Sequence, residues 1–486
     1  MFFLFIVFNL TFLGGYAIIG KHAYKNGKAL NMKRLFGQTV DVTGGPLISS
    51  ILKYSIPVVI GSLIQVLFNA ADIAVLGNMA DGVAVASVGV TASIVGLIVN
   101  SFVGLSSGCT IMLARFIGMR DERQARATVG TSMVSSFFIG LILTVVGIAL
   151  VDPMLGVIEC PDKCWDGAAL YLRIYFMAIP VIMVYNFGAA ILRVNGDTTS
   201  PLLYLVFSGL LNIVLNVVLC LLLTEKVAAV AIATFASQVL GAVLVVFRLT
   251  RTEGDCHLDL RHLSFSPSIL GRVLRLGFPV ALNASLYSLA NLQIQAAINS
   301  FGTGAVAGNT TCTNVEGVLN SVTGALGAAT VAFVGQNIGA GNRDRVKKSI
   351  LTCAMLGVVS CLVMGYGILF FGKDILAIFT PGDAEAIHFG YIRMQFLMSM
   401  YFIPAISSVL NSSTQAFGYT FLPMITSLIT VLGFRVVWMA WIYPHFLIIE
   451  SLYFCFVCSW ILTMLVNAVM FGIVYTRYRR GRTRAV

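Results

Sequence analysis

The sequence predicts an all-α integral membrane protein whose twelve transmembrane helices form two six-helix bundles. Three observations predict this class: of the 486 residues 58% are hydrophobic and 10% are charged, apolar stretches recur along the whole chain, and the two halves repeat each other. Soluble domains have roughly 25% charged residues. The net charge of +11 is divided among short loops, so it does not form the basic face that a nucleic-acid partner requires.

Twelve apolar stretches are long enough to cross a hydrocarbon core about 30 Å thick as helices. The first six cover residues 54–79, 83–113, 127–151, 167–192, 200–223 and 227–248, and the second six cover residues 276–300, 304–334, 350–371, 387–412, 423–443 and 451–475. We therefore expect an N-terminal leader (1–45), an N-terminal lobe (46–248), a cytoplasmic linker (249–275), a C-terminal lobe (276–476) and a basic cytoplasmic tail (477–486).

The basic residues predict the orientation of these helices. If the first helix begins inside, most of the 31 Lys and Arg fall in inner segments, and only Lys163, Lys226 and Lys373 fall in outer loops. Basic residues are concentrated on the cytoplasmic side of membrane proteins. We expect a multi-pass protein of the cell inner (plasma) membrane, with both ends of the twelve-helix body in the cytoplasm.

The first 31 residues allow two interpretations. Residues 1–20 are apolar and are followed by a basic stretch that begins at Lys21, which is the reverse of the charge order in a secretory signal. Either this stretch is an extra N-terminal hydrophobic segment, or translation begins at Met32. In both cases we expect residues 1–31 to be dispensable, because the repeat is complete without them.

A co-linear series of matches relates the two halves. Residues 114–129 align with residues 335–350, residues 84–86 with 305–307, and residues 196–201 with 418–423, all at a nearly constant offset. Each half has six predicted helices, an even number, so both halves enter the membrane from the same side. Parallel repeats that face each other across a midplane cavity are typical of transporters, in which one bundle rocks against the other.

Asp72 is the plainest acidic residue inside a predicted membrane helix. A carboxylate within a bilayer is costly unless it is neutralised or paired, so it indicates a functional site. Asp72, Asn216 and Thr234 each lie about seven residues, or roughly 10 Å, inside the outer end of their predicted helices. Asn212 lies one turn from Asn216 on the same face. One carboxylate, two amides and a hydroxyl suit a small cation or a shared proton, while the two Asn alone are also compatible with helix packing.

Several motifs together resemble the prokaryotic branch of the multidrug and toxin extrusion (MATE) family. They are Pro57, the run from Gln65 to Asp72, residues 212–216, residues 195–201 and residues 336–341. The resemblance spans about residue 45 to the end. It implies two lobes of six helices and export of amphiphilic, often cationic, drugs or metabolites in exchange for H⁺ or Na⁺.

The resemblance also implies a coupling site. In one branch of the family an aspartate on the first helix meets an Asn and an Asp on the fifth and a Thr on the sixth, and Asp72, Asn212, Asn216 and Thr234 match these positions. Asn216 stands where that branch has its second aspartate, which leaves one titratable group and leaves the choice between H⁺ and Na⁺ open. Pro57 offers the first helix a place to bend. No other metal site and no cofactor are expected.

The candidate substrate cavity combines residues from both lobes. We assign to it Gln65, Phe68, Asn69, Tyr287 and Glu316, because aromatic groups and an acid suit varied organic cations. Glu316 is equally compatible with a buried ion pair. Arg435 is expected to pair with an acid or with helix carbonyls, and Arg173 and Arg393 to anchor packing or to extend toward the membrane surface.

Other functions fit the sequence less well. A flippase for a lipid-linked sugar or another lipid needs several cavity cations, a channel needs a filter-like segment, and an enzyme needs a catalytic motif that the sequence lacks. We expect a monomer whose partners are the lipid bilayer and a small-molecule substrate, with no nucleic acid. Cys160 and Cys164 in one outer loop are compatible with a disulfide or with free thiols.

Overall fold

The computed structural model describes residues 39–80 and 82–481. The expectations of an extra N-terminal segment and of a start at Met32 lie outside the described residues, as do the last residues of the basic tail. The residues from Val40 onward belong to one compact unit, and the following description concerns that unit alone.

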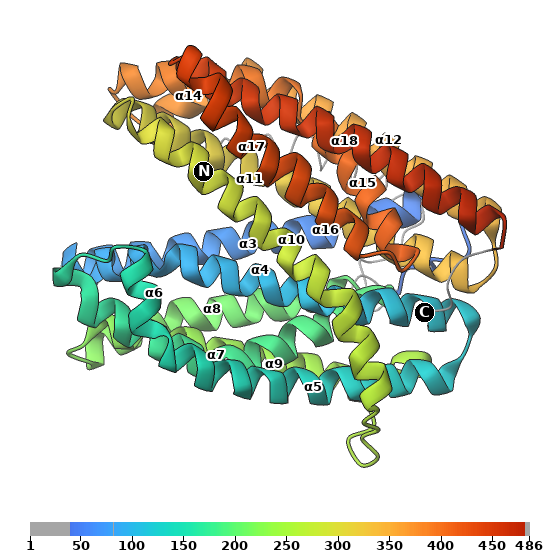
Figure 1. Cartoon of the computed structure of the whole chain (residues 1–486). Coiled ribbons are helices and arrows are strands. Elements are labelled where there is room, and N and C mark those ends of the chain that lie inside the picture. Colours follow the sequence, from blue (N-terminus) through green and yellow to red (C-terminus); the bar gives the residue numbers. More distant parts are fainter. Residues whose placement is uncertain (1–38, 81, 482–486) are drawn as a thin grey trace, which may run out of the picture. The chain divides into compact units, whose positions relative to one another are not determined.

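The first bundle contains six long helices, in agreement with the sequence pattern. They are α3 (Leu47–Met79), α4 (Gly82–Met119), α5 (Glu122–Ala149), α7 (Asp162–Val194), α8 (Thr199–Leu222) and α9 (Lys226–Arg251), with a short α6 (Val151–Val157) between α5 and α7. Helix α7 packs against α4, α5 and α9, while α8 lies between α3 and α9 (Figure 1).

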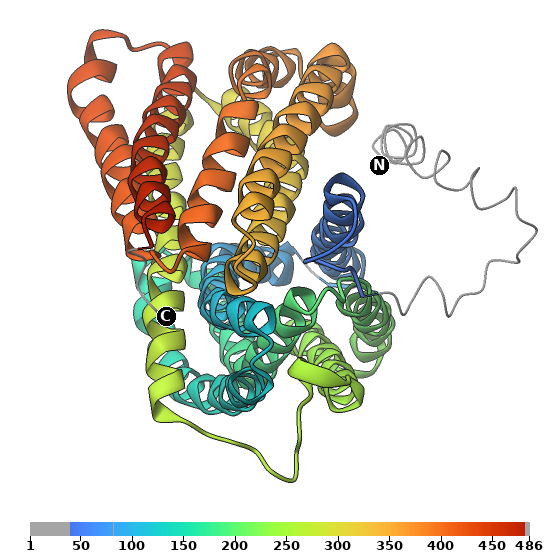
Figure 2. The same cartoon turned by 90° about the vertical axis from the view of Figure 1, so that its right-hand side faces the viewer.

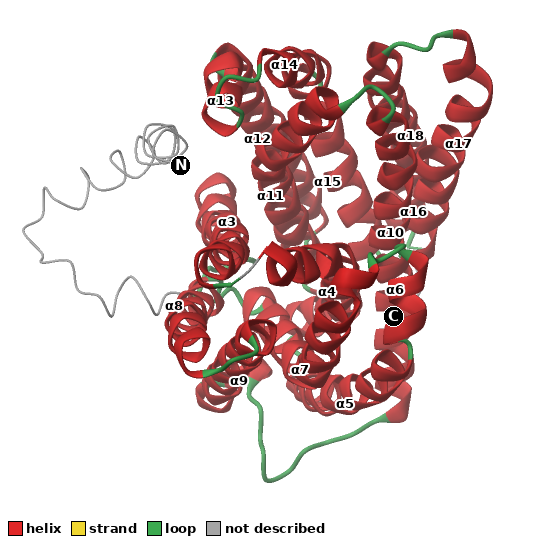
Figure 3. Ribbon diagram, turned by 90° about the vertical axis from the view of Figure 1, so that its left-hand side faces the viewer, coloured by secondary structure: helices red, strands yellow, loops and turns green. Residues whose placement is uncertain are grey.

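The second bundle repeats this plan with more interruptions. It contains α10 (Pro267–Asn299), α11 (Thr303–Gly339), α12 (Arg343–Phe370), the short α13 (Gly372–Phe379), α14 (Ala384–Ser399), α15 (Phe402–Ala416), α16 (Phe421–Ser427), α17 (Phe434–Val437) and α18 (Ile449–Arg479). π-Helical segments, Leu428–Gly433 and Trp438–Ile442, flank α17 on either side. Figure 3 shows the described elements as helices and loops.

The helix lengths confirm the membrane fold class. In the described part of the chain, eleven helical stretches are long and apolar enough to cross a membrane, and the pair α14 and α15, bent by 48°, completes the set of twelve. Helix α10 begins at Pro267, within the range expected to be linker, because proline is well suited to the first turn of a helix.

The repeat is also visible in the local structure at matched positions. The side chain of Asp121 caps the start of α5, and that of Asn342 caps the start of α12, each accepting a hydrogen bond from the backbone N–H three residues later. Gly196 and Gly418 both adopt positive φ, 87° and 82°, a conformation that glycine adopts without a steric penalty. The same turns therefore recur in both bundles.

The two bundles pack tightly at the end where α4 finishes and α10 begins. Gly108 on α4 and Gly277 on α10 lie so close to the opposite backbone that an added Cβ would overlap it. Figure 2, turned from Figure 1, shows the descending α10 beside α4. Since only small residues permit such close approach between membrane helices, these glycines determine how near the bundles come.

Polar contacts join the bundles at the same end. Arg115 donates to the carbonyl of Ala416 at 3.0 Å, Gln336 to the carbonyl of Val194 at 2.6 Å and Asn337 to the carbonyl of Val42 at 3.2 Å. Each of these side chains donates a hydrogen bond to a backbone carbonyl group at or near the end of a helix in the opposite bundle. This end is the one that the sequence predicts to be cytoplasmic.

Candidate functional site

Four side chains from α3, α8 and α9 form one continuous hydrogen-bonded set, which we call the Asp72 cluster (Asp72, Asn212, Asn216 and Thr234). Asn216 Nδ2 donates to Asp72 Oδ1 at 2.6 Å and to Asn212 Oδ1 at 3.3 Å. Asn212 Nδ2 then donates to Thr234 Oγ1 at 3.4 Å. The structure thus brings together Asp72, Asn216 and Thr234, which the sequence placed at one depth, and Asn212, which it placed one turn away.

The Asp72 cluster offers oxygen atoms of three kinds. Asn216 is fully buried, and its Oδ1 has no hydrogen-bond partner among the described residues. A buried amide oxygen without a donor is costly, and a cation or a proton on the neighbouring carboxylate would satisfy it. Carboxylate, amide and hydroxyl oxygens are the ligands that hard cations prefer. The residues present therefore fit a Na⁺ ion as well as a proton.

Phe68 holds the helices of this cluster at their spacing. Its ring packs on Gly209 of α8 so closely that a Cβ at that position would overlap the ring. Phe68 lies one turn before Asp72, and Gly209 lies one turn before Asn212, so the contact positions α3 against α8 beside the cluster. The Phe68 ring is directed toward α8, and its assignment to a substrate cavity stays a prediction.

A cavity of about 580 Å³ lies mainly in the second bundle, with Asn100 of α4 also in its lining, and we call it the C-bundle cavity. Tyr287 and Glu316 line it, as the sequence predicts. Gln65 and Asn69, which the sequence also assigned to the cavity, are exposed on α3 and are absent from its lining. No residue of α3 is in the lining of this cavity, so the helix itself, and not only these two side chains, lies away from it.

A polar stripe on α11, of which only Glu316 was predicted from the sequence, faces this cavity. Thr313, Glu316, Asn320 and Thr323 all line it. Their spacing of three, four and three residues is that of one helix face. Taken together in one apolar helix, these residues would have identified the cavity wall from the sequence.

The structure shows the polar partners of three arginines, Arg173, Arg393 and Arg435, for which the sequence predicted structural roles. Arg393 is buried and forms an ion pair with Glu316 at 2.7 Å, whereas its repeat counterpart Arg173 is half-exposed and pairs with Asp152 at 3.3 Å. Arg435 was expected to bond an acid or helix carbonyls, and this is wrong. It donates instead to Asn291 Oδ1 at 2.6 Å, because the π-helical segments around α17 turn it toward α10.

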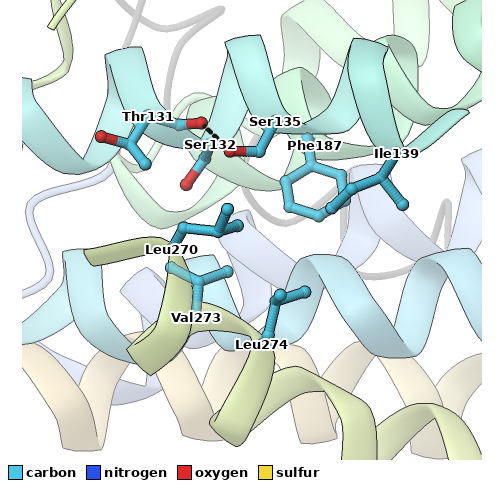
Figure 4. Close-up of a pocket in the computed structure, with 8 residues that line it drawn as sticks. All are labelled: Thr131, Ser132, Ser135, Ile139, Phe187, Leu270, Val273 and Leu274. Carbon is cyan, nitrogen blue, oxygen red and sulfur yellow. Dashed lines mark hydrogen bonds between the residues drawn. The ribbon is translucent and has the colours of Figure 1, made fainter. Parts of the chain in front are cut away.

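Other features provide no further site. A crevice between α5, α7 and α10, lined by residues that include Ser132, Phe187 and Leu274, has no room for a water molecule (Figure 4). In the described residues, no group of three or more His, Cys, Asp or Glu side chains is placed to hold a metal ion. Cys160 and Cys164 are both buried free thiols.

Comparisons with known proteins agree with this arrangement. The MatE family model matches the chain twice, over residues 57–218 and 279–441. The probable multidrug resistance protein YoeA of Bacillus subtilis is 25% identical over 410 residues, which cover 83% of this chain and 88% of that protein. The FAD transporter of Shewanella oneidensis is 23% identical over 344 residues, which cover 69% and 75%.

A solved structure has the same fold. It is described as the outward-facing conformation of a multidrug resistance MATE family transporter, and it superposes with a TM-score of 0.83 at 23% identity. The match covers 91% of this chain and 99% of that one.

Proposed function

Because this chain belongs to the MatE family of membrane transporters, we propose that it is a secondary active antiporter that exports amphiphilic drugs or metabolites, cationic compounds among them, in exchange for H⁺ or Na⁺. The observation that carries the proposal is the Asp72 cluster, in which one carboxylate is linked by hydrogen bonds to Asn216, Asn212 and Thr234 on two further helices. No enzymatic step enters the proposal.

Coupling follows from differential affinity of each ligand for two conformations. A cation or a proton at Asp72 neutralises a carboxylate that is costly in an apolar surrounding, so its binding changes which packing of α3 is favoured. Pro57 lies inside α3 and removes one backbone donor, which gives that helix a place to bend. Ion binding in the first bundle then changes the side of the membrane from which the cavity in the second bundle can be reached.

The contacts between the bundles support an outward-facing state. The bundles are joined at the end predicted to be cytoplasmic, where Gly108 meets the backbone of α10 and Arg115 bonds the carbonyl of Ala416. An antiporter alternates between such a state and one in which these contacts are broken. We place both ends of the twelve-helix body in the cytoplasm and assign the protein to the inner (plasma) membrane as a monomer.

A lipid-linked sugar flippase fits the C-bundle cavity less well. Its pyrophosphate cargo requires several available cations, but the Arg393 guanidinium is already paired with Glu316. Arg435 alone supplies one positive charge, which does not match a polyanion.

The proposal is tested with the purified chain in proteoliposomes. A proton gradient and a sodium gradient are imposed separately, and accumulation of the amphiphilic dye ethidium is measured. Gradient-driven accumulation under at least one condition supports antiport, whereas accumulation that is the same with and without gradients contradicts it.

A further inference from the structure

The C-bundle cavity contains a buried cation for which the described residues provide no carboxylate partner. Arg435 is 1% exposed and lines the cavity. It donates to Asn291 Oδ1 at 2.6 Å and to Ser459 Oγ at 3.4 Å, and its guanidinium stacks on Phe456 at 4.3 Å from the ring centroid. A guanidinium has five N–H donors, so most of its donor capacity is unused.

The charges of the cavity lining do not balance. The lining includes Arg393, Arg435 and Glu316, that is, two positive groups and one negative group. Glu316 is taken by Arg393, whose Nε is itself buried without a hydrogen-bond partner among the described residues. An uncompensated charge inside a protein is strongly unfavourable unless a counter-charge is bound. The lining therefore favours a ligand that brings one negative charge.

The remaining lining residues suit the rest of such a ligand. Asn320 and Asn411 provide neutral amide hydrogen-bond donors, and Trp460 and Phe456 provide aromatic faces. A volume of about 580 Å³ lies in the usual range for small-molecule sites. The cavity has the size and the mixed polarity that an organic ion of a few rings requires.

We propose that the C-bundle cavity binds the oxyanionic group of an amphiphilic organic molecule, with Arg435 as its charge partner and Glu316 as the group that limits its affinity. This proposal rests on the proposed function only in treating the ligand as cargo. Cargo that carries a negative group, with or without a positive one, uses this site, whereas a purely cationic cargo such as ethidium would be bound outside it. Glu316 is not a free attractor for cations, because its carboxylate is held by Arg393.

The test compares two probes with the same naphthalene ring and opposite charge, naphthalene-2-carboxylate and 2-naphthyltrimethylammonium. The full chain is placed in nanodiscs of phosphatidylcholine, which carry no net anionic lipid, and binding is measured by calorimetry without any ion gradient. We expect the carboxylate to bind and R435Q to weaken it about tenfold, since a hydrogen bond to a charged group contributes about 1.5–3 kcal/mol.

A second variant moves affinity in the opposite direction. E316Q removes the competing negative charge and frees Arg393, so it should tighten binding of the carboxylate probe several-fold. Because misfolding cannot improve binding, this result excludes a merely structural effect. R173Q is the matched control: Arg173 is a half-exposed arginine outside the cavity, and its loss should leave both probes unaffected.

The outcomes separate this site from the antiport. Tighter binding of the ammonium probe than of the carboxylate, or weakening of both probes by R435Q and by E316Q alike, overturns the anion site. Because binding is measured without gradients, a chain that binds the carboxylate but accumulates neither ethidium nor the carboxylate probe under either gradient would contradict the antiport and leave the anion site standing.

Discussion

Asn216 Nδ2 lies 2.6 Å from Asp72 Oδ1, and this hydrogen bond joins α8 to α3 at the position where related transporters are expected to have a second carboxylate. Because Asn216 is neutral, the cluster has one negative charge fewer than it would have with an aspartate at this position. The Oδ1 atom of Asn216 has no hydrogen-bond donor among the described residues. We therefore expect the number of charges at this point to set which ion the cluster prefers.

Asn216→Asp should preserve transport and shift the preference toward Na⁺. A second carboxylate beside Asp72 strengthens attraction for a cation, and we expect the sodium concentration for half-maximal transport to fall about tenfold. Sodium titration of ethidium transport in proteoliposomes measures this. Asn78→Asp, on the exposed face of the same α3, is the control. An unchanged sodium titration with Asn216→Asp would exclude Asn216 from the ion site.

Gly209→Ala should disturb the Asp72 cluster through Phe68. The added methyl overlaps the Phe68 ring, and overpacking of this kind costs about 1–3 kcal/mol. We expect a lower midpoint of thermal unfolding and weaker transport. Both should be partly restored by the double variant Gly209→Ala, Phe68→Leu, because the smaller leucine side chain makes room for the added methyl group. If the double variant is no better than the single one, Phe68 does not set the spacing of α3 and α8.

Gly108→Ala should destabilise the state in which the bundles are joined. Its Cβ would overlap the backbone of Val273 and Gly277, a clash that only separation of α4 and α10 relieves. A cost of about 1–3 kcal/mol shifts a two-state equilibrium by about fivefold to more than a hundredfold. Spin labels on the exposed Arg123 and Lys347, each replaced by Cys, report the distance between the bundles.

The contrasting variant for that experiment is Gly317→Ala on α11, where an added Cβ meets nothing within contact range. The distance distribution should lengthen for Gly108→Ala and remain parental for Gly317→Ala. A parental distribution for both would show that the α4 and α10 contact does not hold the bundles together.

Cys160 tests the predicted orientation. It is 7% exposed, and burial raises the pKa of its thiol, with Cys164 and Asp162 adding to the shift. Since the thiolate is the reactive form, an impermeant maleimide should label a Cys164→Ala chain slowly at neutral pH and faster as the pH rises. Labelling should require reagent outside the cell. Cys256, which is fully buried, should remain unlabelled, and labelling of Cys160 only from the cytoplasmic side would invert the topology.

The sequence predicted how deep each residue lies in the membrane better than it predicted the direction in which its side chain points. Helix rise is nearly constant, so positions along α3, α8 and α9 were enough to bring Asp72, Asn212, Asn216 and Thr234 together. The direction of Phe68 depends on how α3 is rotated about its axis, which its evenly apolar sequence does not record. The partner of Arg435 depends on the π-helical segments beside α17, which change the register of that span.

Transport by Asp72→Asn tests the central claim most directly. This variant keeps the shape of the side chain and a partner for Asn216 but removes the only carboxylate of the cluster, so it should insert and fold while losing the dependence on a gradient. The measurement is ethidium accumulation in proteoliposomes under an imposed proton gradient and then under an imposed sodium gradient, with Asp72→Glu alongside. The account predicts no gradient-driven accumulation for Asp72→Asn and partial accumulation for Asp72→Glu. Parental rates for Asp72→Asn under both gradients would contradict it.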